Sequence, residues 1–243
     1  MDLAGRTAVV TGGAVRIGRA ISLELASRGV SVFVHYNRSA SPAESLRQEI
    51  VDGGGVAAIG SVNLSNPGDA SGLIRVAAEA LGSPTILVNS ASGFPSDTIT
   101  DVTLEGFRDT QDLTLATPLM LTQAFADQVP DELGGAIVNV TDVKTTRPYR
   151  KHVSYMLAKG GIDTLTRAAA LALAPNIRVN AVALGVVLPP ANEDDEYARR
   201  LADDLPLRRI GGPQVVADTV AFLLENDFIT GEIIRVDGGG HLV

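Results

Sequence analysis

Three residues in the second half of the chain have the types and the spacing of a proton-transfer site. Tyr155 and Lys159 are four positions apart, so a helix would place both side chains on one face, one turn apart. A nearby ammonium stabilises the phenolate, and it would therefore lower the pKa of Tyr155 from its usual value of roughly 10. Tyr155 is the expected proton donor. Asp142, thirteen residues before it, is the third residue of interest.

Composition limits the kind of protein that holds this pair. The length of 243 residues fits one α/β domain over the whole chain. The net charge of −8 disfavours nucleic acid and anionic membranes as partners. With no cysteine and three scattered histidines, we expect no metal. No basic and apolar leader is evident and the longest apolar run is far too short to span a membrane, so we expect a soluble, cytoplasmic protein.

Short apolar segments alternate along the chain with longer helix-like segments. The apolar segments are continuous, so both faces of each strand are expected to be buried, as in a parallel sheet between helices. Strict alternation predicts a doubly wound, Rossmann-type sheet of about seven strands with helices on both faces. The expected strands cover residues 7–10, 30–35, 56–60, 86–88, 136–140, 177–183 and 233–236. The expected helices cover residues 18–28, 43–52, 69–81, 104–129, 153–174 and 214–224.

One segment, residues 188–207, interrupts this alternation with two prolines and a run of acidic residues. It follows the end of a predicted strand, and ligands bind at the carboxyl ends of strands in such sheets. The segment is therefore a candidate substrate lid. The alternative is a solvated surface helix.

A glycine-rich turn at residues 11–18 lies between the first strand and the first helix. Glycines there let the backbone approach a pyrophosphate, which then lies at a helix N-terminus, so we expect a dinucleotide. The second strand ends without the acid that binds an NAD ribose. Arg38 and Ser39, helped by Arg16, instead make a cationic pocket suited to a 2′-phosphate. We predict NADPH; the alternative is that both arginines are ordinary solvated charges.

Four motifs together resemble the short-chain dehydrogenase/reductase family: residues 11–18, residues 89–92, the Tyr155/Lys159 pair and residues 178–180. The resemblance covers nearly the whole chain. It implies that Tyr155 is the proton donor and that Lys159 also holds the nicotinamide ribose. It also implies a homotetramer, although the sequence does not distinguish a dimer. The implied cofactor contacts are Gly12, Arg16, Ile17, Gly18, Tyr36, Asn37, Arg38, Ser39, Asn63, Leu64, Ser90, Ala91, Ser92, Tyr155, Lys159 and Gly185.

The family usually has a serine where this chain has Asp142. A carboxylate there would repel a carbonyl oxygen, and it suits a substrate with N–H donors or with a ring nitrogen to be protonated, such as a pterin. Residues 35–39 and 92–94 are similar to pteridine reductases, in which an aromatic residue stacks on the pterin. Phe94 has that place here, with a buried loop anchor as its alternative. The implied substrate contacts are Ser92, Phe94, Asp142 and Tyr155.

Shorter matches at residues 151–152, 192–197 and 237–242 are similar to the dihydromonapterin reductase branch of the family. Departures from the family pattern are also present. Thr114 replaces the asparagine that holds a relay water, and a threonine hydroxyl can also bind water. The generic alternative for Asp142 itself is a helix cap or a surface acid.

The sequence thus predicts an NADPH-dependent reductase that transfers hydride to a dihydropterin, with dihydrofolate as a further acceptor. The first alternative is a 3-oxoacyl-thioester or other carbonyl reductase, against which Asp142 and Thr114 argue. The second is a non-catalytic NADP(H)-binding regulator, which would have no need of the Tyr155/Lys159 pair.

Overall fold

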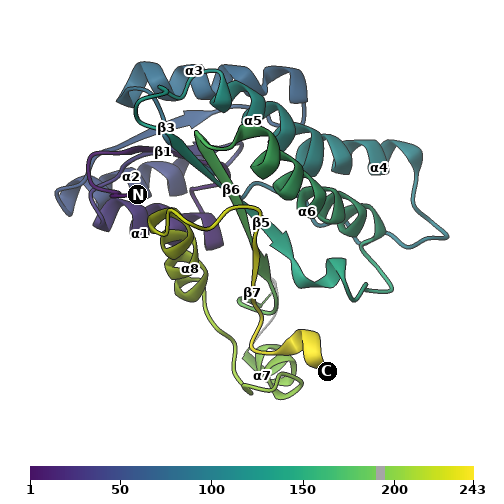
Figure 1. The fold of residues 1–243 in the computed structure, drawn as a ribbon. Coiled ribbons are helices and arrows are strands. Elements are labelled where there is room, and N and C mark those ends of the chain that lie inside the picture. Colours follow the sequence, from purple (N-terminus) through teal and green to yellow (C-terminus); the bar gives the residue numbers. More distant parts are fainter. Residues whose placement is uncertain (190–194) are drawn as a thin grey trace.

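The computed structural model describes residues 1–189 and 195–243. Its centre is one sheet of seven parallel strands in the order β3-β2-β1-β4-β5-β6-β7 (Figure 1). The strand order reverses between β1 and β4, which is where doubly wound sheets bind their ligands. The strands are β1 (Thr7–Val10), β2 (Ser31–Tyr36), β3 (Ala57–Ser61), β4 (Ile86–Asn89), β5 (Gly135–Asp142), β6 (Ile177–Leu184) and β7 (Ile233–Val236).

Helices cover both faces of the sheet (Figure 1). One apolar core joins α1 (Arg16–Ser27), α2 (Ala40–Asp52) and α8 (Gln214–Glu225) to the first face. A second core joins α3 (Ala70–Leu81), α5 (Thr117–Ala126) and α6 (Val153–Leu173) to the other. The predicted doubly wound sheet is therefore confirmed, because strands that are apolar throughout must be buried on both faces.

The segment predicted as one helix over residues 104–129 is more complex. It comprises α4 (Leu104–Gln111), a π-helical segment (Asp112–Ala116) and α5. Pro118 lies in the first turn of α5 and has no N–H to donate to the preceding turn, which favours a wider turn there. A π-helical turn contains one residue more than an α-helical turn, and the spacing of apolar residues in the sequence does not indicate it.

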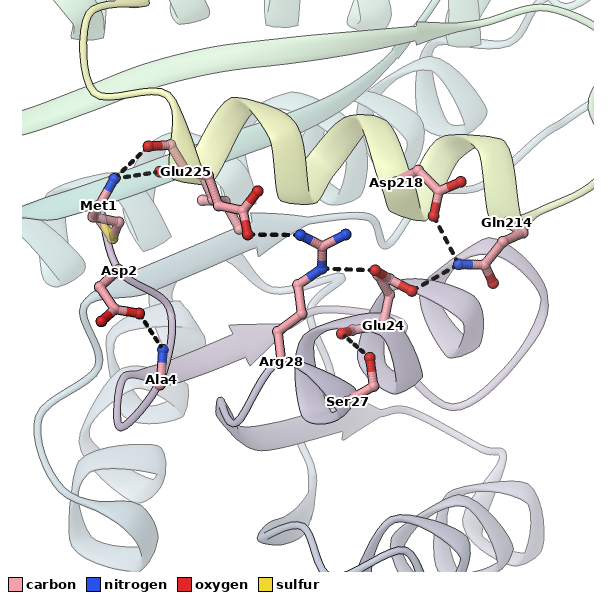
Figure 2. A network of polar contacts seen from close by, with 10 residues as sticks. Met1, Asp2, Ala4, Glu24, Ser27, Arg28, Gln214, Asp218 and Glu225 are labelled. Carbon is pink, nitrogen blue, oxygen red and sulfur yellow. Dashed lines mark hydrogen bonds and ion pairs between the residues drawn. The ribbon is translucent and has the colours of Figure 1, made fainter.

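Polar contacts fasten α8 to α1 (Figure 2). The Arg28 guanidinium, just after α1, donates to Glu24 over 2.7 Å and to Glu225 over 2.6 Å. Gln214 at the start of α8 donates to Glu24 over 2.7 Å and to Asp218 over 2.9 Å. These contacts hold the helix before β7 against the helix after β1. No helix in residues 1–189 or 195–243 is long and apolar enough to cross a membrane.

The candidate lid at residues 188–207 is described only in part, because residues 190–194 lie outside the described residues. The first half of the similarity over residues 192–197 also lies outside the described residues. The described part contains α7 (Asp195–Asp203), which lies beyond the carboxyl ends of β5, β6 and β7 (Figure 1). This part of the candidate lid is helical.

Candidate active site

Asp142 and Tyr155 meet at the carboxyl end of β5. Asp142 is the last residue of that strand and Tyr155 lies in the first turn of α6. The Tyr155 hydroxyl donates to Oδ2 of Asp142 over 2.9 Å. The other oxygen, Oδ1, accepts the backbone N–H of Lys144 over 2.8 Å and thereby caps the short 3-10 helix Val143–Thr145. Asp142 is thus a cap, as one alternative proposed, and also a partner of the tyrosine.

The pKa of Tyr155 does not move in the predicted direction. Burial raises the pKa of this phenol, and the charge and the hydrogen bond of Asp142 raise it further. Lys159 Nζ lies 5.6 Å from the centre of the Tyr155 ring and donates instead to the backbone oxygen of Val140 over 2.6 Å. The prediction that Lys159 lowers this pKa is therefore wrong for the arrangement seen here. Tyr155 keeps its proton.

Lys159 is a buried cation with two acids near it. Burial lowers the pKa of Lys159 to about 8, while Asp142 and Asp163 act in the opposite direction. Asp163 is held in place by the hydroxyl of Thr141, which donates to it over 2.6 Å. Burial likewise raises the pKa of Asp142. The site therefore holds a phenol, a carboxylate and an amine whose protonation depends mainly on their removal from water.

The glycine-rich turn has the close backbone approaches that a dinucleotide site needs. Gly12 has a φ of +62°, and a side-chain carbon on it would lie 3.2 Å from Cα of Ala91. A side-chain carbon on Gly18 would lie 2.2 Å from the Gly12 oxygen, so only glycine fits there. The Thr11 hydroxyl oxygen accepts the N–H groups of Ser90 and Ala91 over 2.9 and 3.0 Å. The turn is thereby held against the loop after β4.

His35 supports this turn, a role that the sequence did not reveal. Its Nδ1 accepts the Gly12 N–H over 3.1 Å, and its Nε2 lies 2.9 Å from the oxygen of Val62. Burial lowers the pKa of His35, which favours a neutral ring that accepts at Nδ1 and donates at Nε2. From the sequence, His35 was of interest only within the similarity over residues 35–39 and among the histidines that we do not expect to bind a metal. The hydrogen bonds become visible only when β2 and the turn are placed side by side.

A small cavity of about 290 Å³ lies beside the turn, and five of the predicted cofactor contacts line it. Arg38 is the cation that lines it, which fits a phosphorylated ribose. Arg16 does not line this cavity; its guanidinium donates to the oxygen of Pro189 over 2.8 Å. The lining residues are Gly12, Ala14, Val15, Tyr36, Asn37, Arg38 and Ser39.

Two further predicted cofactor residues lie after β3, and neither lines this cavity or the larger one described next. Asn63 is exposed, and its side-chain oxygen accepts the N–H of Ser65 over 3.1 Å. Leu64 is buried, and its backbone oxygen accepts the hydroxyl of Thr117 over 2.7 Å. These contacts fix the loop at the edge of the sheet.

A larger cavity of about 890 Å³ opens at the carboxyl ends of the central strands. Its walls include Asp142, Tyr155 and Lys159, and also Tyr197 and Leu201 of α7, so the described part of the candidate lid flanks the site. Ala91 is absent from these walls. The remaining predicted residues that the structure brings together here are Arg16, Ile17, Ser90, Ser92, Phe94 and Gly185.

Gly185 and Thr114 have distinct structural roles near this cavity. A side-chain carbon on Gly185 would lie 2.5 Å from Cβ of Asp237, so glycine permits the close approach of the segments after β6 and β7. Thr114 is buried in the π-helical segment, and its hydroxyl lies 3.5 Å from that of Ser92. Such π-helical turns frequently occur at functional sites.

Phe94 is a half-exposed wall of the cavity rather than a buried loop anchor. Its ring stacks on His152 with centroids 3.8 Å apart and planes at 15°, and it meets Tyr155 edge-on at 4.8 Å. His152 precedes α6 in a left-handed conformation, and its Nδ1 lies 2.7 Å from the oxygen of Pro95. The sequence marked His152 only through the match at residues 151–152, and the stack itself is a tertiary contact.

Comparison with known proteins shows what this chain is similar to. The family model described as Enoyl-(Acyl carrier protein) reductase matches residues 13–241. FolM alternative dihydrofolate reductase 1 from Brucella canis, crystallised in complex with NADP, has a TM-score of 0.95 and 36% identity, covering 100% of this chain and 96% of that one. A 3-oxoacyl-[acyl-carrier-protein] reductase from Synechocystis sp. is 32% identical, covering 98% of this chain and 97% of the relative. An oxidoreductase from Methylorubrum extorquens is 33% identical over 98% of both chains.

Proposed function

The chain belongs to the short-chain dehydrogenase/reductase family of oxidoreductases, and we propose that it is an NADPH-dependent reductase of dihydropterins. The observation that carries the proposal is the 2.9 Å hydrogen bond from the Tyr155 hydroxyl to Asp142 inside the large cavity. A carboxylate beside the proton donor disfavours a carbonyl acceptor and favours one with ring N–H groups. The similarity to the Brucella canis dihydrofolate reductase adds support.

The proposed cofactor is NADPH, which supplies the hydride when it is bound. Arg38 and Ser39 would hold its 2′-phosphate, because a guanidinium binds phosphate through parallel hydrogen bonds and both residues line the small cavity. The pyrophosphate would lie against the backbone at Gly12 and bind at the N-terminus of α1, where free N–H groups can donate to it. Lys159 would bind the nicotinamide ribose. The NADP named for the Brucella canis structure agrees with this choice.

The proposed proton path begins at the Tyr155 hydroxyl. Hydride adds to the carbon of the C=N bond, and the nitrogen must gain a proton. Tyr155 is protonated and would supply this proton, and burial raises the pKa of Asp142, which favours its uptake of a proton in turn. Asp142 would accept a pterin N–H or pass a proton to the ring. Phe94 and Ser92 would contact the pterin from the loop after β4.

A second candidate function is reduction of a 3-oxoacyl thioester. It is favoured by the family description and by the identity with the Synechocystis sp. reductase. Asp142 opposes it, since a carboxylate beside the phenol destabilises the alkoxide that forms from a ketone.

We further propose that the chain forms one domain in which residues 188–207 are the substrate lid. We also propose that the protein is a homotetramer. Size-exclusion chromatography with light scattering would test the oligomeric state.

The deciding experiment follows NADPH absorbance with purified protein and three acceptors: a dihydropterin, dihydrofolate and an acetoacetyl thioester. The expected result is turnover of the dihydropterin, with little or none of the thioester. Turnover of the thioester alone would overturn the proposal in favour of the carbonyl reductase. NADPH binding with no turnover of any acceptor would favour the non-catalytic regulator. Repeating the assay with NADH tests the cofactor, because a clear NADH preference contradicts the role of Arg38.

A further inference from the structure

A basic loop joins β5 to α6 in a chain that is otherwise acidic. Lys144, Arg147, Arg150 and Lys151 lie within eight residues, and no acid occurs between residues 143 and 162. The whole chain carries a net charge of −8. Such a local excess of cations creates a positive potential that attracts anions to this part of the surface.

This loop forms part of the wall of the large cavity. Lys144, Arg147 and Tyr149 line the cavity together with Asp142 and Tyr155. Several contacts fix the loop to the site: the backbone N–H of Lys144 bonds to Asp142, and that of Tyr149 lies 3.0 Å from the sulfur of Met156 in α6. Two of the four positive charges, Lys144 and Arg147, therefore lie on the wall of the cavity that holds the proton donor.

None of the four cations of the loop forms an ion pair with an acid within residues 1–189 and 195–243. Lys144 Nζ lies 5.2 Å from the centre of the Tyr149 ring, and its charge also acts on Asp142, where it opposes the rise in pKa that burial causes. Two acids on the cavity wall have other hydrogen-bond partners, since Asp142 binds Tyr155 and Asp237 binds His241. The third, Asp204, directly follows α7. Elsewhere, by contrast, arginines are paired with glutamates, as at Arg19, Arg28, Arg47 and Arg75.

The cavity is large enough for more than one ring system. A volume of about 890 Å³ is near the upper end of small-molecule sites, roughly 300–1,000 Å³. An acceptor ring beside Tyr155 fills only part of this volume, and Lys144 and Arg147 lie on the wall of the same cavity. A substituent on that ring can therefore reach the basic loop within the cavity.

We propose that the basic loop binds the anionic tail of the acceptor, a carboxylate or a phosphate, with Arg147 as its main contact. A guanidinium on the cavity wall can make two parallel hydrogen bonds to either anion. This inference rests on the proposed function, because it assumes that the ring to be reduced lies at Tyr155. It adds a substrate class: reduced pterins that carry an acidic side chain.

The test compares matched acceptors that differ in their tails. Dihydroneopterin has a neutral side chain, dihydroneopterin monophosphate has a phosphate on the same side chain, and dihydrofolate has a glutamate tail. The wild-type protein is expected to show a higher kcat/KM for at least one anionic acceptor than for the neutral one. The monophosphate and dihydrofolate distinguish a phosphate tail from a carboxylate tail.

Variants of Arg147 then test the contact itself. Arg147→Gln should reduce the ratio of kcat/KM for the preferred anionic acceptor to that for dihydroneopterin about tenfold, and Arg147→Glu should reduce it further. Arg75→Gln, on the exposed face of α3, is the matched control and should leave the ratio unchanged. Higher salt should reduce the wild-type ratio as well, because it screens exposed charges.

Three outcomes would overturn the inference. One is an equal effect of Arg147→Gln on all three acceptors, and another is no effect on any of them. The third is an effect only on an acetoacetyl thioester of acyl carrier protein and not on its small-molecule analogue, which would make the loop a protein-docking surface. If no pterin is reduced, calorimetry with p-aminobenzoylglutamate still tests the loop, because its binding should weaken in Arg147→Glu; unchanged binding would reject the subsite independently of the proposed function.

Discussion

Asp142 ends β5 and Tyr155 lies in the first turn of α6, and their side chains form a 2.9 Å hydrogen bond across the loop between them. The carboxylate is the acceptor and the phenol is the donor. The same carboxylate caps the short helix after β5, so its position is fixed from two sides. This geometry raises the pKa of Tyr155, so the phenol retains its proton.

Replacing Asp142 should test most directly which class of substrate accepts the hydride. Asp142→Ser is expected to reduce kcat for a dihydropterin about 100-fold or more, which is the usual loss when a positioned acid–base group is removed. Activity with an acetoacetyl thioester should fall less or increase. NADPH oxidation in steady state measures both. Asp204→Asn is the control, since Asp204 lines the same cavity without binding Tyr155. Full dihydropterin activity in Asp142→Ser would remove Asp142 from the mechanism.

Arg38 should determine the choice of cofactor. Arg38→Ala is expected to reduce kcat/KM for NADPH about tenfold to 100-fold, because a charge-assisted hydrogen bond contributes roughly 1.5–3 kcal/mol. NADH lacks the phosphate, so its kcat/KM should change little. Arg16→Ala should have the smaller effect, because Arg16 lies outside the small cavity. Arg47→Ala, in an exposed pair with Glu44, serves as the control. An unchanged NADPH/NADH ratio in Arg38→Ala would contradict this assignment.

Phe94 should act through binding more than through chemistry. Phe94→Ala is expected to raise KM for a dihydropterin about tenfold, since one stacked aromatic contact contributes on the order of 1 kcal/mol beyond its buried area. Phe94→Tyr should retain most of the affinity. Phe228, which is 98% exposed, offers a matched control in Phe228→Ala. If kcat falls and KM stays constant, Phe94 positions Tyr155 through their edge-on contact instead of binding the acceptor.

Lys159 should make stability depend on pH. Its pKa is about 8 in the folded protein against a usual value of 10.5, because burial disfavours the charged form. Between these pH values the unfolded chain binds more protons, so the free energy of unfolding rises with pH. The cost of burying the charge is fully present below about pH 8 and is relieved above it.

Urea denaturation of wild type and Lys159→Met at pH 7.5 and 9.5 measures this effect. Wild type is expected to gain about 2 kcal/mol relative to the variant over that interval, following roughly 1.4 kcal/mol per pKa unit. The raised pKa values of the Tyr149 and Tyr155 phenols lower stability as pH approaches 10, where these groups titrate in the unfolded chain, but this effect is common to both proteins and cancels in the comparison. Parallel stability curves for the two proteins would show that Lys159 does not titrate in this range.

The sheet was predictable because its information is local. Each strand is a short apolar run, and burial of both faces leaves few architectures other than a parallel sheet between helices. The glycine-rich turn was equally readable, because a positive φ at Gly12 and a close approach at Gly18 leave no space for a side chain. By contrast, the spacing of apolar residues did not indicate the π-helical turn before Thr117.

The site was predictable only as a set of residues. Spacing alone placed Tyr155 and Lys159 on one helix face, since α-helix geometry fixes that relation. The direction of the Tyr155 pKa was not available from spacing, because burial and the contact with Asp142 outweigh the lysine. Likewise, the stack of Phe94 on His152 joins residues 58 positions apart in the chain.

The sequence by itself therefore determined the reaction class, through side-chain types held at helical and turn spacing. Only the tertiary structure decided which groups share a proton, which ring faces Phe94 and where the cations of the basic loop lie. The physical reason is that protonation and stacking depend on distance and on exclusion of water. Both are established only when β5, α6 and the loop after β4 pack together.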